Sequence, residues 1–199
     1  MEKVIFHIDV NSAFLSWEAA YRIRELGETE DLRLIPCVVG GSEESRHGIV
    51  LAKSESAKKY GVITGEPLVD ARRKCPGLRT VPGNFPVYVK YSKAMMKILE
   101  DYSPDIEQYS IDESFLDMTG TEKLFGPPLE VAHTIKDRIY NELGFTVNVG
   151  ISTNKLLAKM ASDFKKPNLV HTLFPEEVPT KMWPLPVSEL FFVGRQTTK

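Results

Sequence analysis

The sequence has few cysteines, no long apolar segment and no excess of positive charge. Its two cysteines, Cys37 and Cys75, lie far apart, and no apolar leader segment precedes them, which argues against a secreted disulfide framework. No run approaches the roughly 18 apolar residues that a membrane-spanning helix needs, so we expect no membrane segment. These absences together predict a cytoplasmic protein with reduced thiols.

The charges almost cancel, with 25 Lys and Arg against 27 Asp and Glu and a net charge of -2. Nonspecific phosphate binding normally leaves a basic footprint, so any nucleic-acid surface must be local. One local excess is present, because residues 53–79 carry seven basic and three acidic side chains. With 199 residues, 42% of them hydrophobic, the chain has the composition of an ordinary folded protein of one large or two small domains.

The hydrophobic pattern predicts alternating strands and helices. An apolar run at 4–8 predicts a first strand that ends at Asp9, and the next helix is capped by Asn11 or Ser12 and stops near Gly27. The last predicted helix is capped by Ser152 or Thr153, with its large apolar residues on one side and its lysines on the other. The other predicted strands cover 35–40, 48–52, 106–111, 114–118 and 145–151, the other predicted helices cover 54–60, 67–75, 88–103 and 127–143, and a polar turn spans 41–47.

The order of these elements predicts an α+β fold. Without residues 11–83, the succession is strand, helix, strand, strand, helix, strand, which is the ferredoxin-like βαββαβ arrangement. Right-handed crossovers make the first and second strands parallel, and the third strand, antiparallel to both, lies between them. The end of the first strand therefore meets the start of the third, and Asp9, Asp112 and Glu113 are expected to converge on one edge of the sheet.

Three converging carboxylates have a specific chemistry. Because like charges repel, such a cluster needs a cation, and hard oxygen ligands select Mg²⁺ or Mn²⁺. Two such ions can clamp the attacking and leaving oxygens of a phosphoryl or nucleotidyl transfer. The helix after Asp9 offers backbone N–H groups to a triphosphate, and Lys155, Lys159 and Lys166 add positive charge. His7 shares a face with Asp9 and can be read as a ligand, but a packed, hydrogen-bonded histidine is the favoured reading.

Three segments then indicate a family. FHIDVNSAF at 6–14, YSIDES at 109–114 and GISTNKLLAKMASDFKKP at 150–167 resemble the signature segments of Y-family translesion DNA polymerases of the DinB/UmuC type, which include DNA polymerase IV. The resemblance implies a catalytic palm at 1–10 and 84–173 and small inserted α/β fingers at 11–83. Residues 174–199 resemble the start of a thumb, so we expect a piece of a longer chain whose missing region would bind a sliding clamp.

The resemblance also implies an activity and the residues that perform it. The expected enzyme is an error-prone, template-directed DNA polymerase for damage tolerance and DNA repair, in which the primer 3′ hydroxyl attacks a dNTP on primer–template DNA and pyrophosphate leaves. Asp9, Asp112 and Glu113 would be the catalytic carboxylates and, with the backbone carbonyl of Val10, would hold two Mg²⁺ ions, for which Mn²⁺ could substitute. The nucleotide-binding residues would be Asn11, Ser12, Ala13, Phe14 as the steric gate against a 2′ hydroxyl, Lys58, and Lys166 on the triphosphate.

The fingers depart from the family pattern. Many members have a Tyr and, three residues later, an Arg on the triphosphate, where this sequence has Glu55 and Lys58. Lys58 keeps the charge but loses bidentate recognition, and Glu55 cannot replace a tyrosine.

Two other functions fit the same pattern. One is a noncatalytic nucleotide- or nucleic-acid-binding module with this fold. The other is a palm-fold nucleotidyl cyclase, which the missing GGDEF-like loop disfavours.

Overall fold

The structure is a computed structural model that describes residues 2–41, 48–194 and 196–198. The chain forms two compact units. The first unit comprises Met1–Asn11, Ala94–Glu142 and Thr146–Lys199, and the second comprises Ser12–Lys93 and Leu143–Phe145. Most of the predicted turn at 41–47, and residues 195 and 199 of the expected thumb start, lie outside the described residues.

The first unit is built on a five-stranded sheet in the order β5-β6-β1-β7-β8. Its central strand β1 is antiparallel to β6 on one side and to β7 on the other, while the edge strand β8 runs parallel to β7. The predicted position of the third strand between the second and the first is therefore confirmed, and so is the α+β class. The strands are β1 (Ile5–Val10), β5 (Ile106–Gln108), β6 (Glu113–Asp117), β7 (Val147–Ser152) and β8 (Val170–Thr172).

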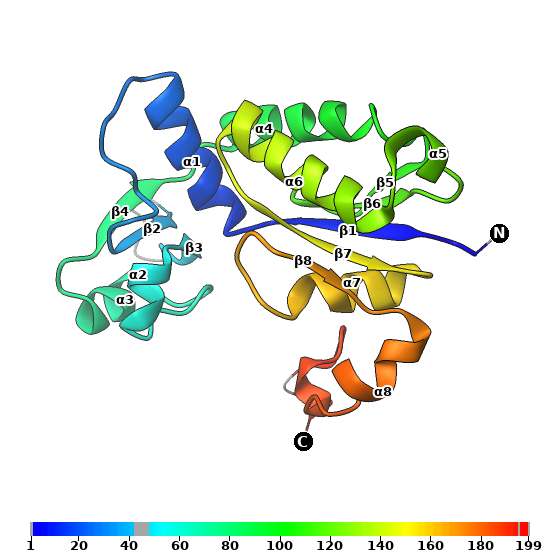
Figure 1. Ribbon diagram of the computed structural model, residues 1–199. Helices are drawn as coiled ribbons and strands as arrows, with labels where there is room; N and C mark the ends of the chain where they lie inside the picture. The colour runs from blue at the N-terminus through cyan, green and yellow to red at the C-terminus, as the bar shows by residue number, and fades with distance from the viewer. Residues whose placement is uncertain (1, 42–47, 195, 199) are drawn as a thin grey trace. The chain divides into compact units, whose positions relative to one another are not determined.

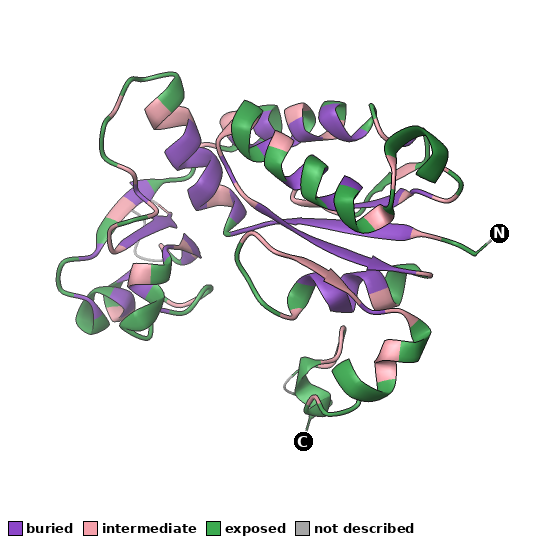
Figure 2. Cartoon of the chain, viewed as in Figure 1, coloured by how far each residue is buried: buried purple, intermediate pink, exposed green. Residues whose placement is uncertain are grey.

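Helices cover both faces of this sheet, α6 on one and α7 on the other (Figure 1). Every residue of β1 and β7 is buried, which explains why β1 reads as a continuous apolar run rather than an alternating one (Figure 2). The amphipathic helix α6 begins at Pro128 and buries Val131, Ala132, Ile135 and Ile139. The helices of this unit are α5 (Glu122–Phe125), α6 (Pro128–Leu143), α7 (Lys155–Asp163), η1 (Pro175–Glu177), α8 (Val178–Lys181) and η2 (Val187–Glu189).

Helix α7 lies unusually close to β7. A Cβ atom on Gly150 would lie 2.5 Å from the backbone nitrogen of Ser162 and closer still to the carbonyl oxygen of Ala158, so only glycine fits there. Small residues of α7 therefore face the sheet, and Ala158 packs with Ile5 and Phe115.

The N-cap predicted for α7 is wrong. Its N-cap is Asn154, whose side chain accepts a hydrogen bond from the Leu157 N–H at 2.9 Å, rather than Ser152 or Thr153. Of its large apolar residues, Met160 packs with Leu173 and the segment that follows it, Leu157 and Phe164 pack against the same cluster, and Leu156 is exposed. Lys159, expected on the polar side, is buried.

The second unit has a three-stranded sheet in the order β3-β2-β4, with β2 antiparallel to β3 and parallel to β4. Its core includes Val38, Val50, Ala57 and Leu68. The elements are α1 (Ala13–Arg24), β2 (Cys37–Gly40), β3 (Val50–Lys53), α2 (Glu55–Lys59), α3 (Leu68–Lys74) and β4 (Arg79–Pro82), and α4 (Phe85–Leu99) runs from this unit into the first.

Helix α1 starts and stops differently from the prediction. Ser12, one of the two expected caps, stands at its N-cap position, but with φ 47°, a left-handed conformation, and its side chain makes no capping hydrogen bond within the described residues. The helix ends at Arg24, before Gly27. The short elements β4, α5 and β8 had no sequence prediction. None of the helices within the described residues has the combined length and apolarity to cross a bilayer.

Candidate active site

The site lies where the ends of two neighbouring strands of the first unit meet. Asp9 of β1 pairs directly with Glu113 of β6, and His7 pairs with Phe115 two residues earlier. Because side chains alternate along a strand, His7, Asp9 and Glu113 share the face of the sheet that α7 covers. The predicted convergence of the first and third strands therefore places two of the three expected carboxylates side by side.

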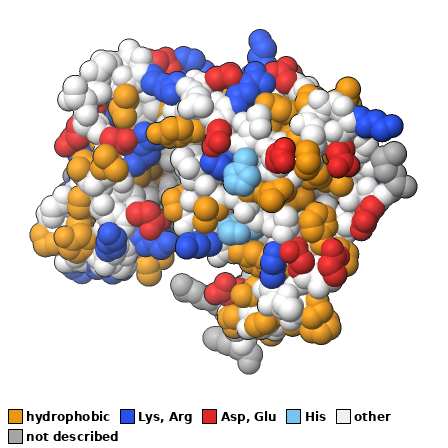
Figure 3. Space-filling model, viewed as in Figure 1, with side chains coloured by type: hydrophobic (Ala, Val, Ile, Leu, Met, Phe, Trp, Pro, Cys, Tyr) orange, Lys and Arg blue, Asp and Glu red, His pale blue; other side chains and the backbone are white. Residues whose placement is uncertain are grey.

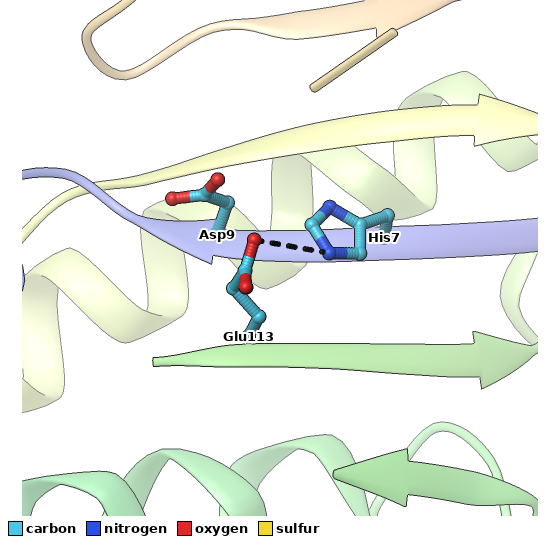
Figure 4. A group of neighbouring side chains, drawn as sticks. All are labelled: His7, Asp9 and Glu113. Atoms are coloured by element: carbon cyan, nitrogen blue, oxygen red, sulfur yellow. Dashed lines mark ion pairs between the residues drawn. The ribbon is translucent and has the colours of Figure 1, made fainter. Parts of the chain in front are cut away.

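His7, Asp9 and Glu113 form a tight cluster, with one ligand-type atom from each within 4.8 Å of the others (Figure 4). His7 is fully buried, Asp9 is buried and Glu113 is half-buried. The Nε2 atom of His7 lies 3.7 Å from Oε1 of Glu113. Burial, reinforced by the charge of Lys159, lowers the pKa of His7 to about 3, so the ring is neutral and this contact is not a salt bridge.

The proton on His7 can be assigned from its neighbours. Its Nδ1 lies 2.8 Å from the Ser162 hydroxyl, and that hydroxyl donates its own proton to the Lys159 carbonyl at 2.8 Å. Ser162 must therefore accept from His7, which puts the proton on Nδ1. Within the described part of the chain, the buried Nε2 has no hydrogen-bond partner, and its lone pair faces the carboxylates.

Two lysines from the far side of the cluster neutralise the carboxylates. Lys159 of α7 forms an ion pair with Glu113 and lies 3.5 Å from Asp9. Lys166, just after α7, lies 2.8 Å from Asp9 Oδ2 and 2.9 Å from Asp163 Oδ1. Basic and acidic side chains are likewise interspersed over the face shown in Figure 3.

The pKa values reflect this balance of burial and charge. Burial raises the pKa of Asp9 above its usual value, although the Lys166 ammonium opposes the rise. Burial would lower the pKa of both lysines, but Glu113 beside Lys159 and Asp9 beside Lys166 raise it. The net effect keeps both lysines charged at neutral pH.

Asp112 lies next to this cluster, but its carboxylate is not part of it. Its backbone carbonyl accepts a hydrogen bond from the Val10 N–H at 3.1 Å, which holds it beside the end of β1. Its side chain accepts from the Ser110 hydroxyl at 2.6 Å. Among the described residues, the cluster with metal-ligand spacing comprises His7, Asp9 and Glu113.

The donor set fits a hard divalent cation. The carboxylates of Asp9 and Glu113 supply the oxygen ligands that Mg²⁺ and Mn²⁺ prefer. The orphaned Nε2 lone pair of His7, beside two anionic groups, adds a buried acceptor that a cation would satisfy. The arrangement is thus an acidic, metal-type site.

Lys166 is held by a loop that is tied to β1 and β7. The Asn11 side chain accepts a hydrogen bond from the Asn168 N–H at 2.9 Å, and the Asn11 backbone N–H donates to the Thr146 carbonyl at 3.0 Å. That backbone group is consequently not available to an anion, unlike the free N–H groups expected at the start of the following helix.

The other predicted residues belong to the second unit. Ser12 is exposed and Ala13 is buried at the start of α1. Phe14 stacks on Tyr88 with ring centroids 5.0 Å apart and meets Phe85 edge-on at 5.5 Å. Lys58 on α2 is exposed and pairs with Glu55 at 3.5 Å.

Sequence reasoning did not identify every side chain in and around the cluster. It expected Lys159 to add positive charge beside the acidic edge, left Asp163 unremarked and favoured His7 as a packed, hydrogen-bonded residue. Lys155, Lys159, Asp163 and Lys166 repeat at helical spacing, which was the available signal. Lys155 itself pairs with Glu107 outside the cluster.

Comparison with known proteins identifies the class. Residues 8–163 match the model of the impB/mucB/samB family, so the chain belongs to this family, that of the Y-family DNA polymerases. Within the class, the chain is 57% identical over 195 residues to DNA polymerase IV of Clostridium acetobutylicum, covering 98% of this chain and 49% of that protein. It is 44% identical over 199 residues to DNA polymerase IV of Acetivibrio thermocellus, covering 100% and 48%.

Solved structures give the same picture. The crystal structure of DinB from Sulfolobus solfataricus aligns with a TM-score of 0.83 and 30% identity, over 98% of this chain and 55% of that one. An insertion ternary complex of Dbh DNA polymerase aligns with a TM-score of 0.82 and 30% identity, over 97% and 55%. The chain spans about half the length of the curated relatives it matches.

Proposed function

We propose that this chain is the catalytic part of an error-prone translesion DNA polymerase of the DNA polymerase IV type. The observation that carries the proposal is the pairing of Asp9 with Glu113 across β1 and β6, in a chain of the Y-family. The proposed substrates are a dNTP and primer–template DNA, and the proposed reaction is nucleotidyl transfer to the primer 3′ hydroxyl with loss of pyrophosphate.

Two Mg²⁺ ions, for which Mn²⁺ could substitute, would be held by Asp9, Glu113 and Asp112 and by the Val10 carbonyl. Bound there, the ions would supply Lewis-acid stabilisation of the attacking and leaving oxygens. For Asp112 to bind an ion, its carboxylate would have to give up the hydrogen bond that it accepts from Ser110 and rotate toward Asp9 and Glu113. The ammonium group of Lys159 contacts both Asp9 and Glu113, so it would reduce the repulsion between the two carboxylates until the metal ions bind.

The remaining residues would bind and select the nucleotide. Lys166 would bind the triphosphate through a charge-assisted hydrogen bond, and Lys58 would add charge without a bidentate contact. Phe14, fixed in its aromatic stack, would reject a 2′ hydroxyl by collision. The backbone N–H groups at Ser12 and Ala13 remain the proposed phosphate contacts, whereas Asn11 would act through its side chain.

The domain assignment is part of the same proposal. Residues 1–10 and 84–173 would be the palm, 11–83 the fingers, and 174–199 the start of the thumb. A sliding-clamp contact would lie in the parts of the relatives that this chain does not span. We also propose a cytoplasmic location, since Cys37 and Cys75 are free thiols.

Primer extension by the full-length protein tests the proposal. Asp9→Asn and Glu113→Gln remove a charge without changing shape and should each slow single-nucleotide insertion with Mg²⁺ by at least about 100-fold. Glu130→Gln, an exposed position on α6, is the matched control and should leave the rate unchanged. Near wild-type insertion by either active-site variant would contradict the mechanism. A wild-type protein that binds nucleotide but extends no primer would instead favour the noncatalytic binding module.

A further inference from the structure

One buried side chain, Asn148 of β7, ties down the loop that carries Lys166. Its Nδ2 donates to the carbonyls of Ser162 at 3.0 Å and Lys165 at 2.6 Å. Its Oδ1 accepts from the Leu169 N–H at 3.2 Å and from the Asn11 side chain at 3.2 Å. The amide thus uses both donors and both acceptor positions, so its orientation is fixed.

The three backbone partners, one in α7 and two in the loop, bracket Lys166. Ser162 and Lys165 come before it and Leu169 follows it, so one fully buried side chain holds the segment on both sides of the lysine. Asn148 also pairs in register with Asp9, the carboxylate that Lys166 contacts.

Two further asparagines complete the arrangement, which we call the asparagine clamp: Asn11, Asn148 and Asn168. Asn11 links the Asn148 amide to the Asn168 N–H. The Asn168 side chain accepts from the buried Lys136 of α6 at 3.2 Å. The clamp therefore connects the loop to β1, to β7 and to α6.

We propose that Asn148, through the asparagine clamp, is a positioning residue that sets where Lys166 meets the triphosphate. This inference rests on the proposed function. Loops between elements are ordinarily mobile, and a long lysine side chain on a mobile loop would sample many positions. Misplacement of a binding group by about 1 Å can cost about 100-fold in rate, so a fixed loop has a direct catalytic value.

The first measurement follows the clamp itself. Asn148→Asp keeps the shape but turns two donated hydrogen bonds into contacts between a carboxylate oxygen and the carbonyls of Ser162 and Lys165. In the full-length protein, amide hydrogen exchange of segment 163–169, followed by mass spectrometry, should accelerate at least about tenfold. The matched control is Asn141→Asp, the same change at an exposed position of α6, and it should leave the segment as in the wild type.

The second measurement tests whether the clamp acts through Lys166. Asn148→Asp should raise KM for the incoming dNTP about tenfold with a smaller change in kcat. In a Lys166→Ala background it should add little, because two changes that act through one contact are not additive. A purely structural role would instead multiply the two effects and lower the kcat of both backgrounds alike.

Each outcome decides a different point. Faster exchange with an unchanged KM, or additive effects with Lys166→Ala, would overturn the positioning role while the polymerase proposal stands. Absence of primer extension by the wild type would overturn the proposed function and this inference with it. If Asn148→Asp does not fold, Asn11→Ala, which removes the acceptor for the Asn168 N–H and one bond to Asn148, should show the same exchange and KM changes to a smaller extent.

Discussion

Replacing Gly150 with alanine tests the close packing of α7 on β7. The added Cβ would lie 2.5 Å from the Ser162 nitrogen, and real Cβ contacts stay above 3.0 Å. The Ala158 carbonyl oxygen lies closer still, and both neighbours are backbone atoms that cannot rotate away. The helix must therefore move off the strand by at least the difference between these distances.

The cost follows from overpacking. Inserting a methyl group into a packed core costs about 1–3 kcal/mol, and we expect the upper end because the clash is with backbone. For a chain of this size, about 3 kcal/mol lowers the midpoint of thermal unfolding by roughly 6–12 °C. The same movement displaces Lys159 and Asp163, which α7 carries into the carboxylate cluster, so the proposed polymerase activity of the full-length protein should fall as well.

Thermal unfolding followed by circular dichroism gives the comparison. Gly77→Ala is the matched control, because Gly77 has no positive φ and a Cβ there would meet nothing within 4 Å. It should melt within about 1 °C of the wild type. If Gly150→Ala melted with the wild type and the control, the tight approach of α7 to β7 would be refuted.

Two further predictions concern the second unit. Phe14→Ala removes the ring stacked on Tyr88 and should raise ribonucleotide insertion relative to deoxynucleotide insertion about 10-fold or more. The control Phe125→Ala should leave this ratio unchanged. If the wild type and both variants discriminate equally, the steric-gate assignment of Phe14 is wrong. Burial alone would raise the pKa of Asp31, but its hydrogen bonds from Arg33 lower it, so the pair stabilises the fold above the unfolded pKa of about 4 and loses that contribution as the pH falls. Asp31→Asn should thus lower urea stability at pH 7, by up to about 1 kcal/mol, and much less at pH 3; equal losses at both pH values would contradict this.

The position of the carboxylate cluster could be predicted because topology alone determines it. A split βαβ order makes the third strand the neighbour of the first, and Asp9 and Glu113 stand at the ends that must meet. The rotamer of Asp112 could not be predicted, because it depends on a local hydrogen bond from Ser110 rather than on strand order.

Which face of α7 packs on the sheet could not be predicted from the sequence, for a physical reason. An amphipathic helix normally turns its large apolar side chains to the sheet, but here the segment after β8 provides a second apolar surface for Met160. The sheet side is left to Ala158 and Ser162, which are small enough for the close approach at Gly150. Lys159, between them, is carried into the cluster as a result, and only the three-dimensional packing reveals it.

The central place of β1 also affects how the protein is made. Its residues leave the ribosome well before their hydrogen-bonding partners, which extend to Asp117 in β6 and Ser152 in β7. At about 5–20 residues per second, β1 waits for roughly ten seconds with both edges unpaired, while most residues of the second unit emerge. The strand that carries Asp9 is thus the segment most exposed to misassembly during synthesis, and chaperone binding to the nascent chain should concentrate there.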